Sequence, residues 1–240
     1  ELLTAIADLA NELKVPVYAH SSETQSEVDD CIKRHGLSPT LYFDSIGMFN
    51  YGGGSYHCVF VSEEDMDVIL KRNVSVVHNP SSNLKLASGI APIQRMVDLG
   101  INLAIGTDGP ASNNALDMFR EMWLTTALQK VNENNAAAVD ADKVLYMATV
   151  GGAKAMGLNE ADTLEVGKLA DIIMIDLNQP NMQPINNITK NLVYSGSKQN
   201  VKLTMIDGKL LYKDNEFFVN DDPRDIYAKA NEIIREKKSN

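Results

Sequence analysis

Cysteine, clustered positive charge and long apolar runs are all scarce in this chain, and each scarcity argues against a class of protein. The cysteines are Cys31 and Cys58, too few for a disulfide framework, which indicates a reducing compartment and a cytoplasmic protein. Lysine and arginine number 22 against 32 acidic residues, for a net charge of −10. They form no cluster that would follow a phosphate backbone, so we expect no nucleic-acid partner. No apolar run reaches membrane-spanning length, so we expect no membrane partner either.

The first residues lack both a methionine and the basic region of a secretory signal. Glu1 already stands at the start of a helical pattern, whose apolar face is made by Leu2, Ile6, Leu9 and Leu13. We therefore expect the 240 residues to be an excerpt of a longer protein.

Short apolar stretches alternate with helical stretches over residues 1–160, which predicts four strand-then-helix units and a parallel sheet. Four strands cannot close a barrel, and a TIM-like (β/α)8 barrel takes about 250 residues. We therefore expect an α/β fold that contains the C-terminal half of such a barrel. Residues 37–56 are expected to be an irregular loop with a short strand at its end, because the tract YGGGSY weakens a strand.

After residue 160 the pattern changes to short strands. Strands are predicted in LADIIMIDL, NLVYSG and VKLTMIDGKLLYKDNEF, with Asp207-Gly208 as a hairpin turn. This indicates a small antiparallel β domain over residues 161–221. Residues 222–240 have one apolar face and many charges, which predicts a C-terminal helix.

Polar residues follow several of the predicted parallel strands. His20 and Glu23 follow VPVYA, His57 and His78 end two later strands, and Asp108 follows INLAIGT. Successive strand ends are where a parallel α/β barrel gathers its catalytic groups. The pattern therefore favours a metal-dependent hydrolase.

Imidazole and carboxylate are suitable ligands for a divalent metal, which makes a nucleophile by lowering the pKa of bound water. His20 and Asp108 are the best ligand candidates, because rigid strands fix their positions. Catalytic zinc takes three protein ligands, so further ligands must come from outside the chain. Glu23 is the candidate general acid and base. His57 either ligates the metal or assists the nucleophile, and the residue types alone leave zinc and iron both open.

Three runs, HNPSSNLKLASGIAP, GTDGPASNNALDMFREM and VGKLADIIMIDL, resemble segments of the amidohydrolase superfamily. The similarity is to the branch of methylthioadenosine/S-adenosylhomocysteine deaminases and chlorohydrolases, and it extends through nearly the whole chain. The resemblance implies one divalent metal, Zn²⁺ with Fe²⁺ as the alternative, and a small-molecule substrate. It also implies that the C-terminal β segment is part of a small β-sandwich domain.

The resemblance implies a role for each matching residue. His20 matches the metal-binding histidine after the fifth barrel strand, and Glu23 matches the proton-shuttling glutamate that follows it. His57 matches the sixth-strand histidine that polarises the nucleophile or substrate. Asp108 matches the eighth-strand aspartate that binds the metal and activates its water. Ser112 aligns with a residue that lines the nucleoside side of the pocket, where Glu23 and His57 would also contact the substrate.

The family's His-x-His pair on the first strand, which supplies two metal ligands, is absent from these residues. The chain alone is therefore not expected to catalyse. It would need the N-terminal half of the barrel or a second copy, and a homo-oligomer is possible. The resemblance also implies that Asn79 and Asn83 belong to a signature loop that shapes the pocket.

The leading hypothesis is a zinc-dependent aminohydrolase that deaminates a purine nucleoside such as methylthioadenosine or S-adenosylhomocysteine. A triazine-type chlorohydrolase, or another cyclic-amidine deaminase, would use the same groups. A hypothesis of another class is a non-catalytic truncated scaffold, because half a barrel leaves a sheet edge and an apolar face unpaired.

Overall fold

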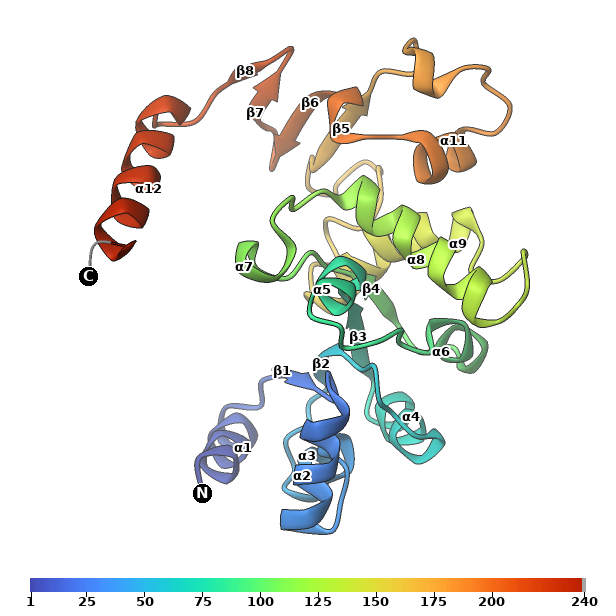
Figure 1. The fold of residues 1–240 in the computed structure, drawn as a ribbon, viewed down its shortest axis with the longest axis vertical. Helices are drawn as coiled ribbons and strands as arrows, with labels where there is room; N and C mark the ends of the chain where they lie inside the picture. The colour runs from blue at the N-terminus through green and yellow to red at the C-terminus, as the bar shows by residue number, and fades with distance from the viewer. Residues whose placement is uncertain (239–240) are drawn as a thin grey trace. The chain divides into compact units, whose positions relative to one another are not determined.

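The computed structural model describes residues 1–238 (Figure 1). Its contacts divide the chain into two compact units, Glu1–Thr163 with Leu177–Lys198, and Leu164–Asp176 with the residues from Gln199 onward. None of the described helices is long and apolar enough to cross a membrane.

The first unit contains a parallel sheet in the order β1-β2-β3-β4. Its strands are β1 (Val17–Ser21), β2 (Gly53–His57), β3 (Val74–His78) and β4 (Leu103–Ile105). The helices of the first half are α1 (Leu2–Leu13), α2 (Gln25–His35), α3 (Pro39–Ser45), α4 (Glu63–Lys71), α5 (Pro80–Lys85) and α6 (Ile93–Leu99). Those that follow β4 are α7 (Pro110–Asn113), α8 (Met118–Asn132), α9 (Ala141–Tyr146), α10 (Gly152–Ala155) and α11 (Ile188–Ser195), with a 3-10 turn at Pro180–Met182.

The second unit contains an antiparallel sheet in the order β5-β6-β7-β8. Its elements are β5 (Ile172–Ile175), β6 (Val201–Ile206), β7 (Lys209–Lys213), β8 (Glu216–Phe217) and α12 (Pro223–Lys238). Asp207 and Gly208 both have positive φ in the tight turn between β6 and β7, as the sequence predicts. The predicted C-terminal helix is present, although residues 239 and 240 of that prediction lie outside the described part.

Local sequence explains the main boundaries of the first unit. The hydroxyl of Ser62 accepts a hydrogen bond from the Asp65 backbone N–H while the Asp65 carboxylate accepts one from the Ser62 N–H, so the two residues form a capping box for α4.

The core between the sheet and the helices is apolar, and its fully buried members include Ile69, Val76 and Ile93.

The helix after the loop at residues 133–140 contains a wide π-helical turn, η1 (Met147–Gly151), between α9 and α10. Gly151 lies so close to the backbone carbonyl of Leu103 in β4 that any Cβ there would collide with it. The wide turn therefore places the helix backbone directly against the sheet.

Two predictions of local structure are wrong. NLVYSG was expected to be a strand, but Asn191–Ser195 lie in α11 and Gly196 is its C-cap. The Asn187 side chain caps the start of this helix, and Val193 is buried. A short apolar run does not distinguish a buried strand from a buried helix, and α11 packs on α8 and α9. The expected loop at residues 37–56 contains α3, which Ser38 caps and Pro39 begins.

The α/β class, the parallel sheet and the separate antiparallel sheet are confirmed. Residues 177–198 group with the first unit, although they lie within the segment 161–221 that was expected to be β domain. The division into a partial barrel at residues 1–160, part of a β-sandwich domain at 161–221 and a C-terminal helix at 222–240 stays a prediction.

Candidate metal and catalytic site

The carboxyl ends of the four parallel strands meet at one edge of the sheet, and the polar residues predicted from the sequence lie there. His20 is the penultimate residue of β1, and His57 and His78 are the last residues of β2 and β3. Asp108 follows β4. His57 and Asp108 have φ values of 73° and 55°. Backbone in this left-handed region is costly for residues other than glycine and is concentrated at functional sites.

His20, His57 and Asp108 form a cluster in which one ligand atom from each lies within 4.8 Å of the others. Among residues 1–238 this is the one group of three or more such side chains that could hold a metal ion. Two imidazoles and one carboxylate are a donor set found in catalytic zinc sites. The chain thus offers a fitting partial site, in which His57 stands beside the two ligands predicted from the sequence.

His57 is fully buried, and its hydrogen bonding determines which ring nitrogen is free. Its Nδ1 lies 2.7 Å from the side-chain oxygen of Asn83, so Nδ1–H donates to that oxygen. In the neutral ring Nε2 then carries the lone pair. Nε2 is buried without a hydrogen-bond partner among the described residues, and it lies 3.8 Å from Glu23 Oε2 and 4.0 Å from Asp108 Oδ2. An orphaned lone pair between two carboxylates fits a site that receives a cation or a polarised water.

Asp108 accepts three hydrogen bonds that hold it in its charged form. Ser82 Oγ and Ser112 Oγ donate to Oδ2 at 2.6 and 2.7 Å, and the Gly109 N–H donates to Oδ1 at 2.7 Å. Burial raises the pKa of the Asp108 carboxyl, but these donors and the nearby His57 outweigh it and lower the pKa to about 2. Asp108 is therefore a carboxylate at neutral pH, as a metal ligand must be.

Glu23 is held over the cluster by the loop after β1. The carboxylate of Glu27 accepts hydrogen bonds from the backbone N–H groups of Ser22 and Glu23 at 3.0 and 2.8 Å. Thr24 caps α2 by accepting from the Glu27 N–H. The Glu23 side chain itself is partly exposed, with one oxygen facing His57, so it can exchange protons with a bound molecule.

The fourth strand-end residue, His78, is separate from this cluster. It is buried, and burial lowers the pKa of its imidazole to about 3, with the nearby His57 acting in the same direction. Neither ring nitrogen has a hydrogen-bond partner among the described residues. His78 is thus a buried, neutral residue that is not part of the ligand cluster.

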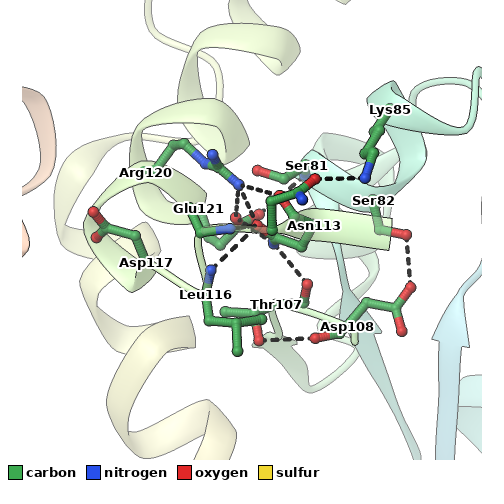
Figure 2. Close-up of polar contacts among 12 residues, drawn as sticks. Ser81, Ser82, Lys85, Thr107, Asp108, Asn113, Leu116, Asp117, Arg120 and Glu121 are labelled. Atoms are coloured by element: carbon green, nitrogen blue, oxygen red, sulfur yellow. Dashed lines mark hydrogen bonds and ion pairs between the residues drawn. The ribbon is translucent and has the colours of Figure 1, made fainter. Parts of the chain in front are cut away.

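The structure places the remaining predicted residues as follows. Ser112 donates to Asp108, so its predicted contact with substrate stays a prediction. Asn79 and Asn83, expected only to shape a pocket, are both buried, and Asn83 contacts His57. Sequence reasoning missed Ser82 and Glu27. The spacing Thr24-x-x-Glu27 before a helical stretch is a capping-box pattern and could have revealed Glu27. Ser82 contacts Asp108, which lies 26 positions further along the sequence (Figure 2), so no local pattern reveals it.

Several known proteins are similar to this chain. It is 44% identical over 217 residues to the 5-methylthioadenosine/S-adenosylhomocysteine deaminase of Thermococcus onnurineus, covering 90% of this chain and 51% of that protein. It is 42% identical over 240 residues to the 5'-deoxyadenosine deaminase of Methanobrevibacter smithii, covering 99% of this chain and 55% of that protein. The chain thus spans about half the length of the curated relatives it matches.

Among solved structures, an adenosine deaminase from Xanthomonas campestris with bound zinc superimposes with a TM-score of 0.94 at 36% identity. The match covers 99% of this chain and 54% of that chain. The prediction of half a TIM-like barrel with an added β segment is confirmed by this similarity. The model of the amidohydrolase family matches residues 1–211, which include the whole first unit and part of the second, and the chain belongs to that family.

Proposed function

We propose that this chain carries one half of the active site of a zinc-dependent aminohydrolase that deaminates a purine nucleoside. The observation that carries the proposal is the convergence of His20, His57 and Asp108 with Glu23 beside them. The names of the relatives support a substrate such as 5-methylthioadenosine, S-adenosylhomocysteine or 5'-deoxyadenosine.

His20 and Asp108 would hold the zinc, with the remaining ligands supplied from outside these 240 residues. When bound, zinc acts as a Lewis acid that lowers the pKa of water from about 15.7 to about 7. Asp108 enters the site already ionised, because its three donors stabilise the carboxylate. Iron would suit the same donors.

Glu23 would transfer protons, and His57 would orient the nucleophilic water or the substrate. The Glu23 carboxylate would accept a proton from the nucleophilic water and deliver it to the departing amine, so that ammonia leaves and the ring carbon gains an oxygen. His57 would present Nε2 to the same water or to the substrate, because Asn83 occupies Nδ1. Both side chains would also contact the substrate, with Ser112 at the nucleoside side of the pocket.

Two expectations about the protein in its cell accompany this proposal. Cys31 and Cys58 are both unpaired, and Cys58 is fully buried with the pKa of its thiol raised to about 12 by burial. We expect the protein to act in the cytoplasm, where such thiols stay reduced. We also expect the rest of the barrel, or a second chain in a homo-oligomer, to complete the site.

The proposal is tested on the protein as encoded in full by its gene, by measuring zinc content and ammonia release. The substrate panel contains the three nucleosides named above, adenosine and a chlorotriazine. We expect Glu23→Gln to lower kcat by about 10²- to 10⁴-fold with zinc retained, and Asp108→Ala to lose both zinc and activity. Glu64→Gln, an exposed glutamate of α4, is the matched control and should resemble the unmodified protein.

Full turnover by Asp108→Ala would refute the role of that residue. Chloride release from the triazine without ammonia release from any nucleoside would favour the chlorohydrolase alternative. Absence of zinc and of turnover with every compound would favour the non-catalytic scaffold.

A further inference from the structure

Helix α8 contains a carboxylate that lies outside the site and is completely buried. Glu121 has no exposed surface, yet its two oxygens have separate partners on two other segments (Figure 2). Oε2 accepts from the Ser81 backbone N–H at 3.0 Å, and Oε1 accepts from Asn113 Nδ2 at 2.9 Å. Arg120 Nη2 lies 3.6 Å from Oε1. A buried polar oxygen without a hydrogen-bond partner is unfavourable, so each oxygen of Glu121 needs the donor that it has.

The first contact fixes helix α5. Ser81 is in the first turn of α5, which has no side-chain cap of its own, so its N–H would otherwise be an unsatisfied amide at a helix start. Helix α5 in turn contacts both reactive groups. Ser82 Oγ donates to Asp108 at 2.6 Å, and the Asn83 side-chain oxygen lies 2.7 Å from His57 Nδ1.

The second contact fixes the loop that follows β4. Asn113 Nδ2 is 2.9 Å from Glu121 and also 2.6 Å from the carbonyl oxygen of Thr107. The loop is thereby closed around Asp108, and it brings Ser112 Oγ to 2.7 Å from the Asp108 carboxylate. Both segments that donate to Asp108 therefore depend on one carboxylate of α8.

We propose that Glu121 is a positioning residue, which orients His57 and Asp108 together by anchoring α5 and the loop 107–113. This inference rests on the proposed function, since it takes those two residues as the working groups. Glu121 itself touches neither the substrate site nor the metal-ligand cluster.

The test uses Glu121→Gln in the protein encoded in full by its gene. The amide keeps the shape of the side chain but replaces one acceptor oxygen with an NH₂ donor, which then faces either the Ser81 N–H or the Asn113 NH₂. Gln129→Met is the matched control. Gln129 is fully buried on the same helix, and its side chain bonds Ala91 and Gln94 instead of α5.

The first measurement is amide hydrogen exchange in metal-free protein, which depends on neither zinc nor substrate. We expect Glu121→Gln to accelerate exchange about tenfold or more at residues 81–86 and 109–114, and Gln129→Met to accelerate it around Gln94 alone. The second is the zinc dissociation constant, which should rise about tenfold in Glu121→Gln and stay within about twofold in Gln129→Met. The third measurement is steady-state kinetics. We expect Glu121→Gln to reduce kcat about tenfold with KM nearly unchanged, because the variant disturbs the orientation of His57 and Asp108 and leaves the substrate contacts in place.

Equal exchange and equal zinc affinity in Glu121→Gln and the unmodified protein would overturn the inference. So would equal losses in both variants, which would reveal a general effect of stability. If Glu121→Gln does not fold, Asn113→Ala removes one of the two contacts and should accelerate exchange at 109–114 while sparing 81–86. If the protein shows these exchange and zinc effects but deaminates none of the nucleosides, the proposed function is refuted and the role of Glu121 still holds.

Discussion

At the scale of single residues, Asp108 shows how hydrogen bonds lower the pKa of a partly exposed carboxyl group and stabilise its charged form. Two hydroxyls, of Ser82 and Ser112, donate to the same oxygen. We expect Ser82→Ala and Ser112→Ala each to lower kcat/KM by about ten- to a hundredfold, since a hydrogen bond to a charged group contributes about 1.5–3 kcal/mol. A double-mutant cycle measures whether the two hydroxyls act independently. Ser45→Ala, an exposed serine of α3, is the control, and unchanged kinetics in the double variant would contradict this account.

His78 gives a prediction about pH. Its folded pKa is about 3, below the ordinary value of 6.5. Between these values the unfolded chain binds a proton that the folded chain excludes, so the free energy of unfolding decreases as pH falls from about 6.5. The stabilisation is complete above 6.5 and is lost at about 1.4 kcal/mol per pH unit below it.

We therefore expect His78→Leu to flatten the pH dependence of stability between about pH 7 and pH 5, by roughly 2 kcal/mol over that interval. Urea unfolding of metal-free protein at each pH measures it. His35→Asn, at an exposed helix end, should keep the original slope. An unchanged slope in His78→Leu would show that the buried ring is not the group responsible.

Residue types and their position after apolar runs were sufficient to predict that His20, His57 and Asp108 lie at one edge of a sheet. They could not predict the partners of these residues. Ser82, Asn83 and Glu121 act through contacts that span 26–40 positions of the sequence, and nothing in their local pattern indicates which strand end they will meet.

At the scale of elements, β2 shows why composition misleads. Its glycines were expected to weaken the strand, but β2 pairs with both β1 and β3. Gly53 has a φ of 132°, and a Cβ there would collide with the Val17 carbonyl oxygen. The glycines are thus what allows the neighbouring strand to approach, which propensity alone does not reveal.

This contact predicts that Gly53→Ala prevents stable folding, because both the backbone conformation and the space exclude a side chain. Gly152→Ala is the contrasting variant, since Gly152 lies within a helix and the nearest atom beyond its own helical turn, the Met147 carbonyl oxygen, would lie 3.7 Å from the added Cβ. It should be neutral or stabilising by up to about 1 kcal/mol. Thermal unfolding of both variants measures the difference, and a well-folded Gly53→Ala would contradict the close approach.

At the scale of the whole molecule, both sheets could be predicted from the sequence. The alternation of apolar and helical stretches over residues 1–160 predicted the parallel sheet, and the short strands after residue 160 predicted the antiparallel one, because the periodicity of apolar residues indicates which faces are buried. The strand assigned to NLVYSG was wrong because those residues form α11, which packs on α8 and α9. Such long-range packing leaves little trace in a six-residue window.

The number of metal ligands in the chain gives a prediction about its affinity for zinc. Three candidate ligands lie in this chain, and we expect the remaining ligands of the proposed zinc site to come from outside it. We expect the isolated 240 residues to bind zinc at least about tenfold more weakly than the protein encoded in full, and to release no ammonia from adenosine derivatives. Zinc titration and an ammonia assay on both forms measure this, and turnover by the isolated chain would disprove it.

The wide turn η1 has a consequence for how relatives of this chain can differ in length. A π turn holds one residue more than an α-helical turn, so deleting one residue from Met147–Val150 would restore regular pitch and leave the flanking residues on their faces of the helix. Gly151 would still lie beside the Leu103 carbonyl, where no Cβ fits. Relatives that are one residue shorter in this turn should therefore still have glycine at the position of Gly151.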